Sequence, residues 1–397
     1  MSVDRYKKDV PLEAMRGVAS FSVLAWHLAG AFFQRPVFTV SPREWFAIFT
    51  GPAAVNFFFV LSGLVLTRRA LAQGDASALA RSALKRWPRL AGPIVITMLL
   101  SYALYRAGLY YTAESNLISN SAWLQMFVRL GPVHPGFVDA LRKGVFDVLF
   151  RGDYEYDGNL WTMMYEFRGS FLALGLAMAL IPLRHASRLA PVMLAGTAIL
   201  AVGFMDVQYL TFVAGVLLAA VLAWRPLHLP LAVVVLFGVV GLYLVGYTDG
   251  ADYRGMPLIG AHVSPVMIQT VAALLILVAI EGAPAVQRAL SGKFAVLLGR
   301  LSFPVYLVHT LVICSLGCAT LVLVQGHLPG RWPRICAVLV SIAGTLAVAW
   351  PLAMWDVWWV RQVNRAAAIL IPRAASEARA GKASGLLAGD PVPATST

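Results

Sequence analysis

The sequence predicts an all-α integral membrane protein, a polytopic bundle of about ten transmembrane helices. Hydrophobic residues make up 59% of the 397 residues and charged residues only 13%, which is more apolar surface than a soluble domain of this length can bury. The apolar residues are grouped in about ten segments, most of them long enough to cross a bilayer. These segments are approximately 12–32, 47–67, 90–110, 159–182, 190–205, 207–224, 230–247, 262–280, 303–324 and 335–359.

The distribution of Lys and Arg predicts the orientation of these helices. The net charge of +13 would suggest nucleic-acid binding in a soluble protein, but here the basic residues gather in alternate loops, which are cytoplasmic by the positive-inside rule. The opposite loops are acidic or mixed, although Arg331 and Arg334 break the trend. We therefore expect a multi-pass protein of the cell (inner) membrane with both termini cytoplasmic and no nucleic-acid partner. The basic positions are Arg5, Lys7, Lys8, Arg68, Arg69, Arg81, Lys85, Arg86, Arg89, Arg184, Arg188, Arg225, Arg288, Lys293, Arg300, Arg361, Arg365 and Arg373.

The chain divides into a membrane domain, 1–360, and a tail, 361–397, that is first basic and then rich in Ala, Gly, Ser, Pro and Thr, as in disordered tails. Residues 111–158 are too few and too mixed for a separate domain, so we expect a lid or re-entrant segment. The first segment resembles a signal peptide, but Arg16 interrupts its apolar core, which favours a retained helix.

The first apolar segment carries Arg16 and His27, two ionisable residues that a lipid-exposed helix disfavours. Eleven residues make three helical turns plus about 20°, so both side chains lie on one face, about 16 Å apart along the axis. A snorkelling Arg and a core His would explain the pair structurally. The alternative is that both side chains have a functional role, at two different depths in the membrane.

The second and third segments add weaker signals. Ser62-Gly63 permits close helix approach, and plain packing is the favoured interpretation. Arg86 and Arg89 stand at the cytoplasmic entrance of the third segment, three residues apart and on one face. Two guanidinium groups there suit a phosphate-bearing ligand, and ordinary cytoplasmic anchoring of the helix is an equal alternative.

Two later segments contain further polar residues. Glu166 lies inside the outer end of the fourth segment, where it neutralises either Arg168 or a basic group on another helix. Tyr306 and His309 share a face of the ninth segment. Together with the first segment, these positions predict a polar site in the interior of the bundle.

The ordered motifs resemble those of the acyltransferase 3 family of membrane acyltransferases. They are Arg16-x10-His27, FFFVLSG at 57–63, Arg86-x-x-Arg89 with Pro93, LWTMMYEF at 160–167 and LSFPVYLVH at 301–309. The resemblance covers residues 10–360. This sequence differs from many bacterial members at Arg168-Gly169-Ser170, a difference that bears on the identity of the acceptor more than on the acyl-transfer chemistry. A second difference is that no hydrolase-like domain follows the tenth helix.

The resemblance implies an enzyme that moves an acyl group, usually acetyl, from cytoplasmic acyl-CoA to a hydroxyl of a carbohydrate. The acceptor would be a cell-surface polysaccharide, a lipopolysaccharide, or another glycan or glycolipid. No permanently bound cofactor is expected, since acyl-CoA is a substrate. The other expected partners are membrane lipid and a separate extracytoplasmic enzyme. In the family pattern, Arg16 and His27 form the essential pair, Arg86 and Arg89 the paired arginines, and Glu166 the recurring carboxylate.

The chemistry of such a transfer agrees with these residues. Acyl transfer needs a base for the alcohol proton and a donor for the oxyanion, with water excluded. His27 is the expected base, whether the acyl group passes directly or through an acyl-histidine. Arg16 would bind or polarise the donor, Arg86 and Arg89 would hold the CoA phosphates, and Glu166 would orient or balance a histidine. Trp161 and Tyr306 would stack on the sugar, beside His309.

Other functions fit the sequence less well. Buried Arg, His and Glu in ten helices also suit a proton-coupled transporter of a small solute, which is the alternative. The ordered motifs and the paired arginines argue against it. No nucleophile elbow, zinc-protease motif or P-loop is present, and Cys314, Cys318 and Cys336 lack metal-ligand spacing, so no metal site is expected.

Overall fold

The computed structural model confirms the predicted all-α class. Every described element is a helix, apart from an isolated bridge between Gln325 and Leu328. The structure describes residues 9–33, 50–132, 134–183, 189–224, 227–247 and 263–370.

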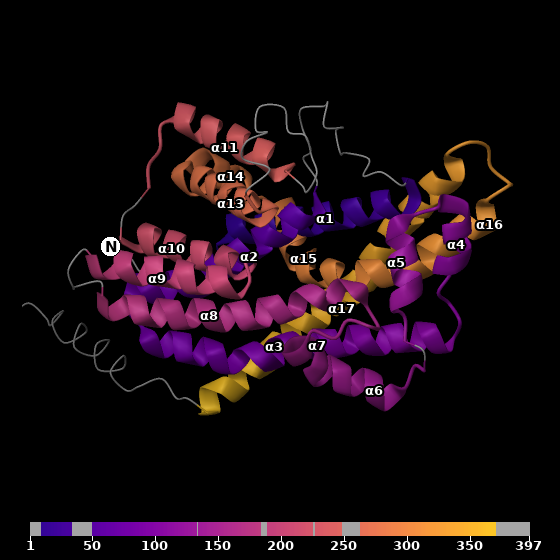
Figure 1. The fold of residues 1–397 in the computed structure, drawn as a ribbon, viewed down its shortest axis with the longest axis horizontal. Helices are drawn as coiled ribbons and strands as arrows, with labels where there is room; N and C mark the ends of the chain where they lie inside the picture. The colour runs from indigo at the N-terminus through magenta and orange to yellow at the C-terminus, as the bar shows by residue number, and fades with distance from the viewer. Residues whose placement is uncertain are drawn as a thin grey trace, which may run out of the picture.

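Each of the ten predicted apolar segments corresponds to a helix. Six helical stretches of the described chain are long and apolar enough to cross a membrane, and α10 and α11 are shorter apolar helices, so ten crossings stays a prediction. In Figure 1 most of these helices lie roughly side by side, with α11 and α13 toward the top and α3 toward the bottom, and α17 runs obliquely across them. The helices are α1 (Val10–Phe33), α2 (Gly51–Gln73), α3 (Ala76–Arg106), α8 (Trp161–Leu183), α9 (Leu189–Met205), α10 (Tyr209–Trp224), α11 (Leu231–Val245), α13 (Pro265–Gly282), α14 (Pro284–Ala289), α15 (Lys293–Val312) continued by the π-helical turn η4 (Ile313–Gly317) and α16 (Cys318–Val324), and α17 (Trp332–Leu370).

Helices α1 and α15 pack closely because glycines stand at their crossing. A Cβ atom at Gly17 would lie 2.6 Å from the backbone of Leu298, and one at Gly299 would lie 2.8 Å from the carbonyl oxygen of Glu13. The hydroxyl of Ser20 donates across the same interface to the carbonyl of Ser302, at 2.7 Å. This contact brings the two histidine-bearing helices together.

The expectation that Ser62-Gly63 permits close helix approach is confirmed. A Cβ atom at Gly63 would lie 2.3 Å from the carbonyl oxygen of Phe212, so α2 and α10 meet almost backbone to backbone. Small residues of this kind allow apolar helices to gain dispersion contacts where no hydrophobic driving force exists between them.

Helix α3 begins earlier than predicted. The side chain of Asp75 accepts from the backbone N–H of Ala78 at 3.0 Å and caps a helix that runs through Pro88 and Pro93. Contacts with α17 support this stretch, since Trp359 Nε1 donates to the carbonyl of Pro88 at 2.8 Å. Arg86 and Arg89 therefore lie about three turns inside the helix, and their predicted place at its entrance is wrong.

The last helix also exceeds its predicted bounds. Helix α17 continues through the predicted boundary at residue 360 and ends at Leu370, so the first ten residues of the predicted tail are helical. The remainder of the tail, 371–397, lies outside the described residues, as do Arg184, Arg188 and Arg225.

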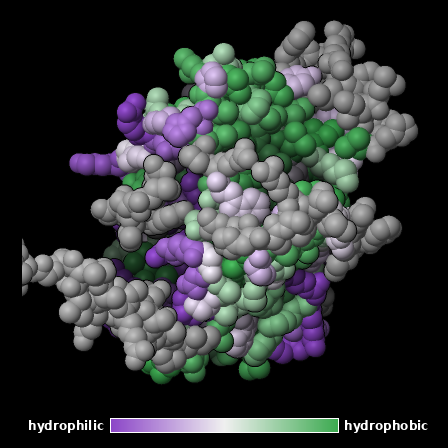
Figure 2. Space-filling model, turned by 90° about the vertical axis from the view of Figure 1, so that its left-hand side faces the viewer, coloured by the Kyte–Doolittle hydropathy of each residue, from purple (hydrophilic) through white to green (hydrophobic). Residues whose placement is uncertain are grey.

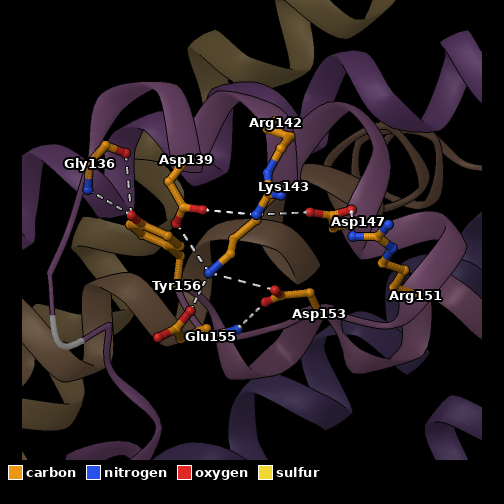
Figure 3. A network of polar contacts seen from close by, with 9 residues as sticks. All are labelled: Gly136, Asp139, Arg142, Lys143, Asp147, Arg151, Asp153, Glu155 and Tyr156. Atoms are coloured by element: carbon orange, nitrogen blue, oxygen red, sulfur yellow. Dashed lines mark hydrogen bonds and ion pairs between the residues drawn. The ribbon is translucent and has the colours of Figure 1, made fainter.

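The predicted lid folds into short helices that return toward the bundle. They are α4 (Thr112–Ser119), α5 (Ala122–Leu130), α6 (Phe137–Arg142), the π-helical turn η2 (Lys143–Asp147), α7 (Val148–Arg151) and the 3₁₀ turn η3 (Gly158–Leu160). Figure 3 shows the charged network that holds the second half of this segment, in which Lys143 pairs with Asp139, Asp153 and Glu155. Although burial lowers the pKa of Lys143, the hydrogen bonds to Glu155 and Asp139 outweigh it and raise that pKa above its usual value.

The outer surface fits a lipid environment. Many large apolar side chains are exposed on the helices, among them Leu236 at 57% and Leu339 at 61%. On the face shown in Figure 2, hydrophobic residues form broad areas, while hydrophilic residues gather in a few clusters. A soluble protein seldom exposes so much contiguous apolar surface, which agrees with a membrane protein.

Candidate active site

A cavity of about 90 Å³ between α1, α3 and α8 is lined by three arginines and one carboxylate. Helix α1 supplies Arg16, α3 supplies Arg86 and Arg89, and α8 supplies Glu166. Three positive charges against one negative charge leave this "arginine cavity" with a net positive lining. Such a cavity favours an anionic ligand, in particular one with phosphate groups.

The partner of Glu166 is Arg86. These two side chains form a salt bridge, and Ser62 donates to Glu166 Oε1 at 2.8 Å. Arg168 instead donates to the carbonyl of Phe150 at 2.6 Å. Of the two partners that the sequence allowed, the structure thus shows the basic group on another helix. The contacts of Glu166 with described residues include no histidine, so the predicted pairing with a histidine is not seen.

The three arginines differ in how far the protein neutralises them. Arg86 is buried and its charge is neutralised by the ion pair with Glu166, although its Nε has no partner among the described residues. Arg89 lies within electrostatic reach of Asp356 on α17. Arg16 makes only a long contact of 3.5 Å with Glu13. Arg86 is thus first of all an internal ion pair, Arg89 lies within reach of several carboxylates, and Arg16 has only a loosely held partner among the described residues.

His27 and His309 form a hydrogen-bonded pair across the interface of α1 and α15. The distance from His27 Nδ1 to His309 Nε2 is 2.7 Å, and the two rings are nearly parallel, with centroids 5.0 Å apart. His309 is fully buried. Trp123 of α5 packs against the other side of His27, at a centroid distance of 5.0 Å. The short helices of the predicted lid thus cover the pair.

The hydrogen bonds around His309 select the tautomers of both rings. His309 Nδ1 lies 2.8 Å from the carbonyl oxygen of Tyr306 and 3.1 Å from that of Val305. A carbonyl oxygen can only accept, so we assign the proton of His309 to Nδ1 and leave Nε2 as an acceptor. His27 must then donate from Nδ1, which leaves the lone pair of His27 Nε2 unused. This is the arrangement that a general base requires.

His27 lines a second and larger cavity, of about 380 Å³, which we call the "histidine cavity". Trp26 also contributes from α1, Asn56 from α2, Trp161 from α8 and Gln269 from α13. Trp161 is 38% exposed, and its stacking on a sugar stays a prediction. The cavity thus offers aromatic faces and amide groups next to a histidine.

Tyr306 and Val55 line both cavities, which are therefore neighbours in the bundle. The hydroxyl of Tyr306 lies 2.6 Å from Thr162 Oγ1 and 3.3 Å from the carbonyl oxygen of Asn159. Asn159 Nδ2 donates to the carbonyl of Tyr306 at 2.5 Å. These bonds fix the position of the phenol in the wall that the two cavities share.

Asp157 lies just before η3 and α8, and it contacts Thr310 of α15, the helix that carries His309. Burial raises the pKa of this carboxyl to about 7, against the hydrogen bonds that it accepts from Thr310 Oγ1 (2.6 Å) and the backbone N–H of Asn159 (3.2 Å). Its second oxygen has no partner in the described part of the chain. Asp157 therefore keeps a proton at a pH where an ordinary aspartate is charged.

Sequence reasoning found the charged and aromatic groups of the site but missed its amides. Asn56 and Gln269 lie inside apolar segments, and an amide at such a position was the available signal, because a membrane helix seldom carries one without a partner. Gln208 is the second residue of the predicted segment 207–224, and an amide at the end of a segment gave no signal. Thr162 stands in the motif at 160–167 and Asn159 directly precedes it, and the sequence analysis assigned neither residue a role.

Within the part of the chain that the structure describes, no group of three or more His, Cys, Asp or Glu is placed to hold a metal ion. Cys314 and Cys318 are buried free thiols on consecutive turns of the helix.

Comparison with known families covers nearly the whole chain. A family model described as an acyltransferase domain matches residues 10–354, which include both cavities. No curated protein and no solved structure matches the chain.

Proposed function

This chain belongs to the acyltransferase 3 family, and from that premise we propose that it moves an acetyl group from cytoplasmic acetyl-CoA to a carbohydrate hydroxyl. The observation that carries the proposal is the His27–His309 pair, in which His27 lines one cavity beside a second cavity lined by arginines. The two cavities supply separate places for donor and acceptor.

The arginine cavity is the proposed site of the donor. CoA carries several phosphate charges at one end and the thioester at the other, joined by a long flexible arm. Arg16 and Arg89, together with Arg86 Nε, would bind phosphate oxygens with charge-assisted hydrogen bonds. The arm would then extend past Tyr306, which places the thioester near His27. The salt bridge between Arg86 and Glu166 would keep the buried guanidinium in place.

The histidine cavity is the proposed site of the acceptor. In the proposed step, His27 Nε2 takes the proton of the acceptor hydroxyl as its oxygen attacks the thioester carbonyl. The C–O bond forms, the C–S bond breaks, and the proton passes from His27 to the leaving thiolate of CoA. Tyr306 lines both cavities, and its hydroxyl is a candidate donor to the oxyanion. His309 acts through its hydrogen bond to His27, as a positioning residue.

The orientation in the membrane is part of the proposal. Arg16 and Arg89 lie toward the end of the bundle where the sequence predicts cytoplasmic loops. His27 lies toward the other end, where Trp123 of the short helix α5 packs against it. Cysteine labelling of intact cells tests this, after the three native cysteines are replaced by alanine. An impermeant thiol reagent should label a cysteine at Asp153 and not one at Arg81; the reverse pattern would contradict the orientation.

The activity is tested with radiolabelled acetyl-CoA and inside-out membrane vesicles that contain the protein. Label should accumulate in the glycan or glycolipid fraction, should be released by mild alkali as expected for an ester, and should be absent with the His27→Gln variant. Equal labelling by that variant, or no labelling by wild-type protein with acetyl-CoA or a longer acyl-CoA, would refute the proposal.

A further inference from the structure

Trp123 of the short helix α5 covers the imidazole of His27 on the side of the lid. The indole and imidazole centroids lie 5.0 Å apart, and the two ring planes are tilted by 34°. A Cβ atom at Gly30, three residues after His27 on α1, would lie 3.4 Å from the Cβ atom of Trp123. The tryptophan therefore rests on about one turn of α1, the turn that begins with His27.

Contacts on both sides of Trp123 hold the indole in place. Ser121 Oγ donates to the carbonyl oxygen of Gly30 at 2.6 Å, which joins α5 to α1, and the same oxygen caps the first turn of α5. Phe127, one turn further along α5, packs on Trp123 with centroids 4.4 Å apart. A Cβ atom at Gly158 would lie 2.7 Å from the ring of Phe127, so the returning end of the lid supports this ring closely.

The indole separates His27 from the outer surface of α5. Trp123 is half-buried, and Ala122 beside it and Met126, three residues further on, are exposed. Trp123 does not line the histidine cavity, although His27 does. The indole thus covers His27 from a direction other than that of the cavity. With an acceptor in the cavity, loss of the indole would open a second path to the imidazole.

Water on that path would compete with the acceptor hydroxyl. In the competing step, His27 takes a proton from water as the water oxygen attacks the thioester carbonyl. The C–O bond forms, the C–S bond breaks, and the proton passes from His27 to the CoA thiolate, which gives acetic acid and free CoA. A closed site prevents such hydrolysis because it excludes water from the reacting groups.

We infer that Trp123 is a specificity residue that keeps water from His27 and thereby directs the acyl group to the hydroxyl acceptor. The inference rests on the proposed function and concerns the choice between acceptor and water. If Trp123 served packing alone, its loss would lower acyl transfer and hydrolysis together. A shielding role has the opposite signature, since hydrolysis gains while transfer does not.

The experiment measures two products from radiolabelled acetyl-CoA in membrane vesicles, alkali-labile ester and free acetate, after subtraction of the products formed with His27→Gln. The ratio of acetate to ester should rise about tenfold in Trp123→Ala, which is about 1.4 kcal/mol between the two barriers. Trp123→Phe should stay near the wild-type ratio, since a ring remains over the imidazole. Ser121→Ala should raise the ratio with the indole intact, because α5 loses its bond to α1.

The matched control is Phe146→Ala, which removes another ring of the lid, stacked on Trp87 of α3 with centroids 5.4 Å apart. This variant should keep the wild-type ratio. Independently of acyl transfer, deuterium exchange at the C2 carbon of His27, followed by mass spectrometry, should be severalfold faster in Trp123→Ala and unchanged in Phe146→Ala. An equal fall of both products, or unchanged exchange at His27, would overturn the inference. Faster exchange without any acetyl transfer by the wild-type protein would refute the proposed activity instead, and leave the shielding of His27.

Discussion

Replacing His27 by glutamine removes the proposed base while it keeps a side chain that can hydrogen-bond. Because His309 Nδ1 is committed to backbone carbonyls, His309 Nε2 must accept, and the amide nitrogen of the substituted glutamine can still donate to it. The pair is thereby kept without a basic lone pair. The expected effect is a loss of turnover with little loss of folded protein.

The magnitude follows from the role of each ring. General base catalysis contributes about 10²- to 10⁴-fold, so kcat of His27→Gln should fall by that factor, about 2.7 to 5.4 kcal/mol in activation free energy. His309→Leu leaves the base in place but removes the acceptor of His27 Nδ1–H at 2.7 Å. One unpaired buried donor costs about 1 to 3 kcal/mol, so kcat should fall about 10- to 100-fold.

The assay is acetyl transfer at saturating acetyl-CoA, with the protein level measured by fluorescence-detected size exclusion. KM for acetyl-CoA should stay near the wild-type value in both variants, since the arginines line a different cavity. Exposed His228 is the control, and its change to glutamine should have no effect, as should Ala at His134 and His185. Retained turnover in His27→Gln with complete loss in His309→Leu would refute the assignment and make His309 the base.

Three further predictions concern the arginine cavity, the helix crossing and pH. Arg89→Ala should raise KM for acetyl-CoA about 10- to 100-fold in steady-state kinetics, whereas Arg86→Ala should lower the folded yield and Tm, because a buried carboxylate loses its partner at about 3 to 5 kcal/mol. Gly17→Val should lower Tm because its Cβ would lie 2.6 Å from the backbone of α15, and the same change at Gly175, which has no atom within 4 Å, should not; equal Tm values would contradict the close packing. Asp157 binds a proton in the folded protein up to about pH 7, but only to about pH 4 when unfolded, so stability should fall as the pH rises between these values, by roughly 4 kcal/mol relative to Asp157→Asn; parallel Tm profiles from pH 4 to 8 would contradict this.

The fold class and the polar positions could be predicted because both are local properties of the chain. Runs of apolar residues identified a helix at each of the ten segments, and the spacing of Arg16 and His27 placed them at two depths of one helix. Helix ends were less predictable. Helix α3 continues through two prolines that local sequence disfavours, supported by the contact of Trp359 with the Pro88 carbonyl, and α17 passes residue 360 because helix-favouring residues follow the end of its apolar run.

The partners of each polar group depended on tertiary structure. The hydrogen bond between His27 and His309 joins residues 282 positions apart, and the ion pair between Arg86 and Glu166 joins residues 80 positions apart. Sequence reasoning left Arg168, a basic group on another helix and a histidine open as partners of Glu166, because a carboxylate within an apolar helix indicates that a partner exists without indicating which one.

Hydropathy and residue order were sufficient to identify an α-helical membrane acyltransferase and the charged residues that enter its interior. The packed helices were needed to show that Arg16, Arg86, Arg89 and Glu166 line one cavity, that His27 lines a second, larger one, and that Tyr306 belongs to both linings. This difference arises because the rotation and depth of each helix are set by close contacts such as Gly17 against α15. Those contacts involve residues far apart in the chain, and no local pattern specifies them.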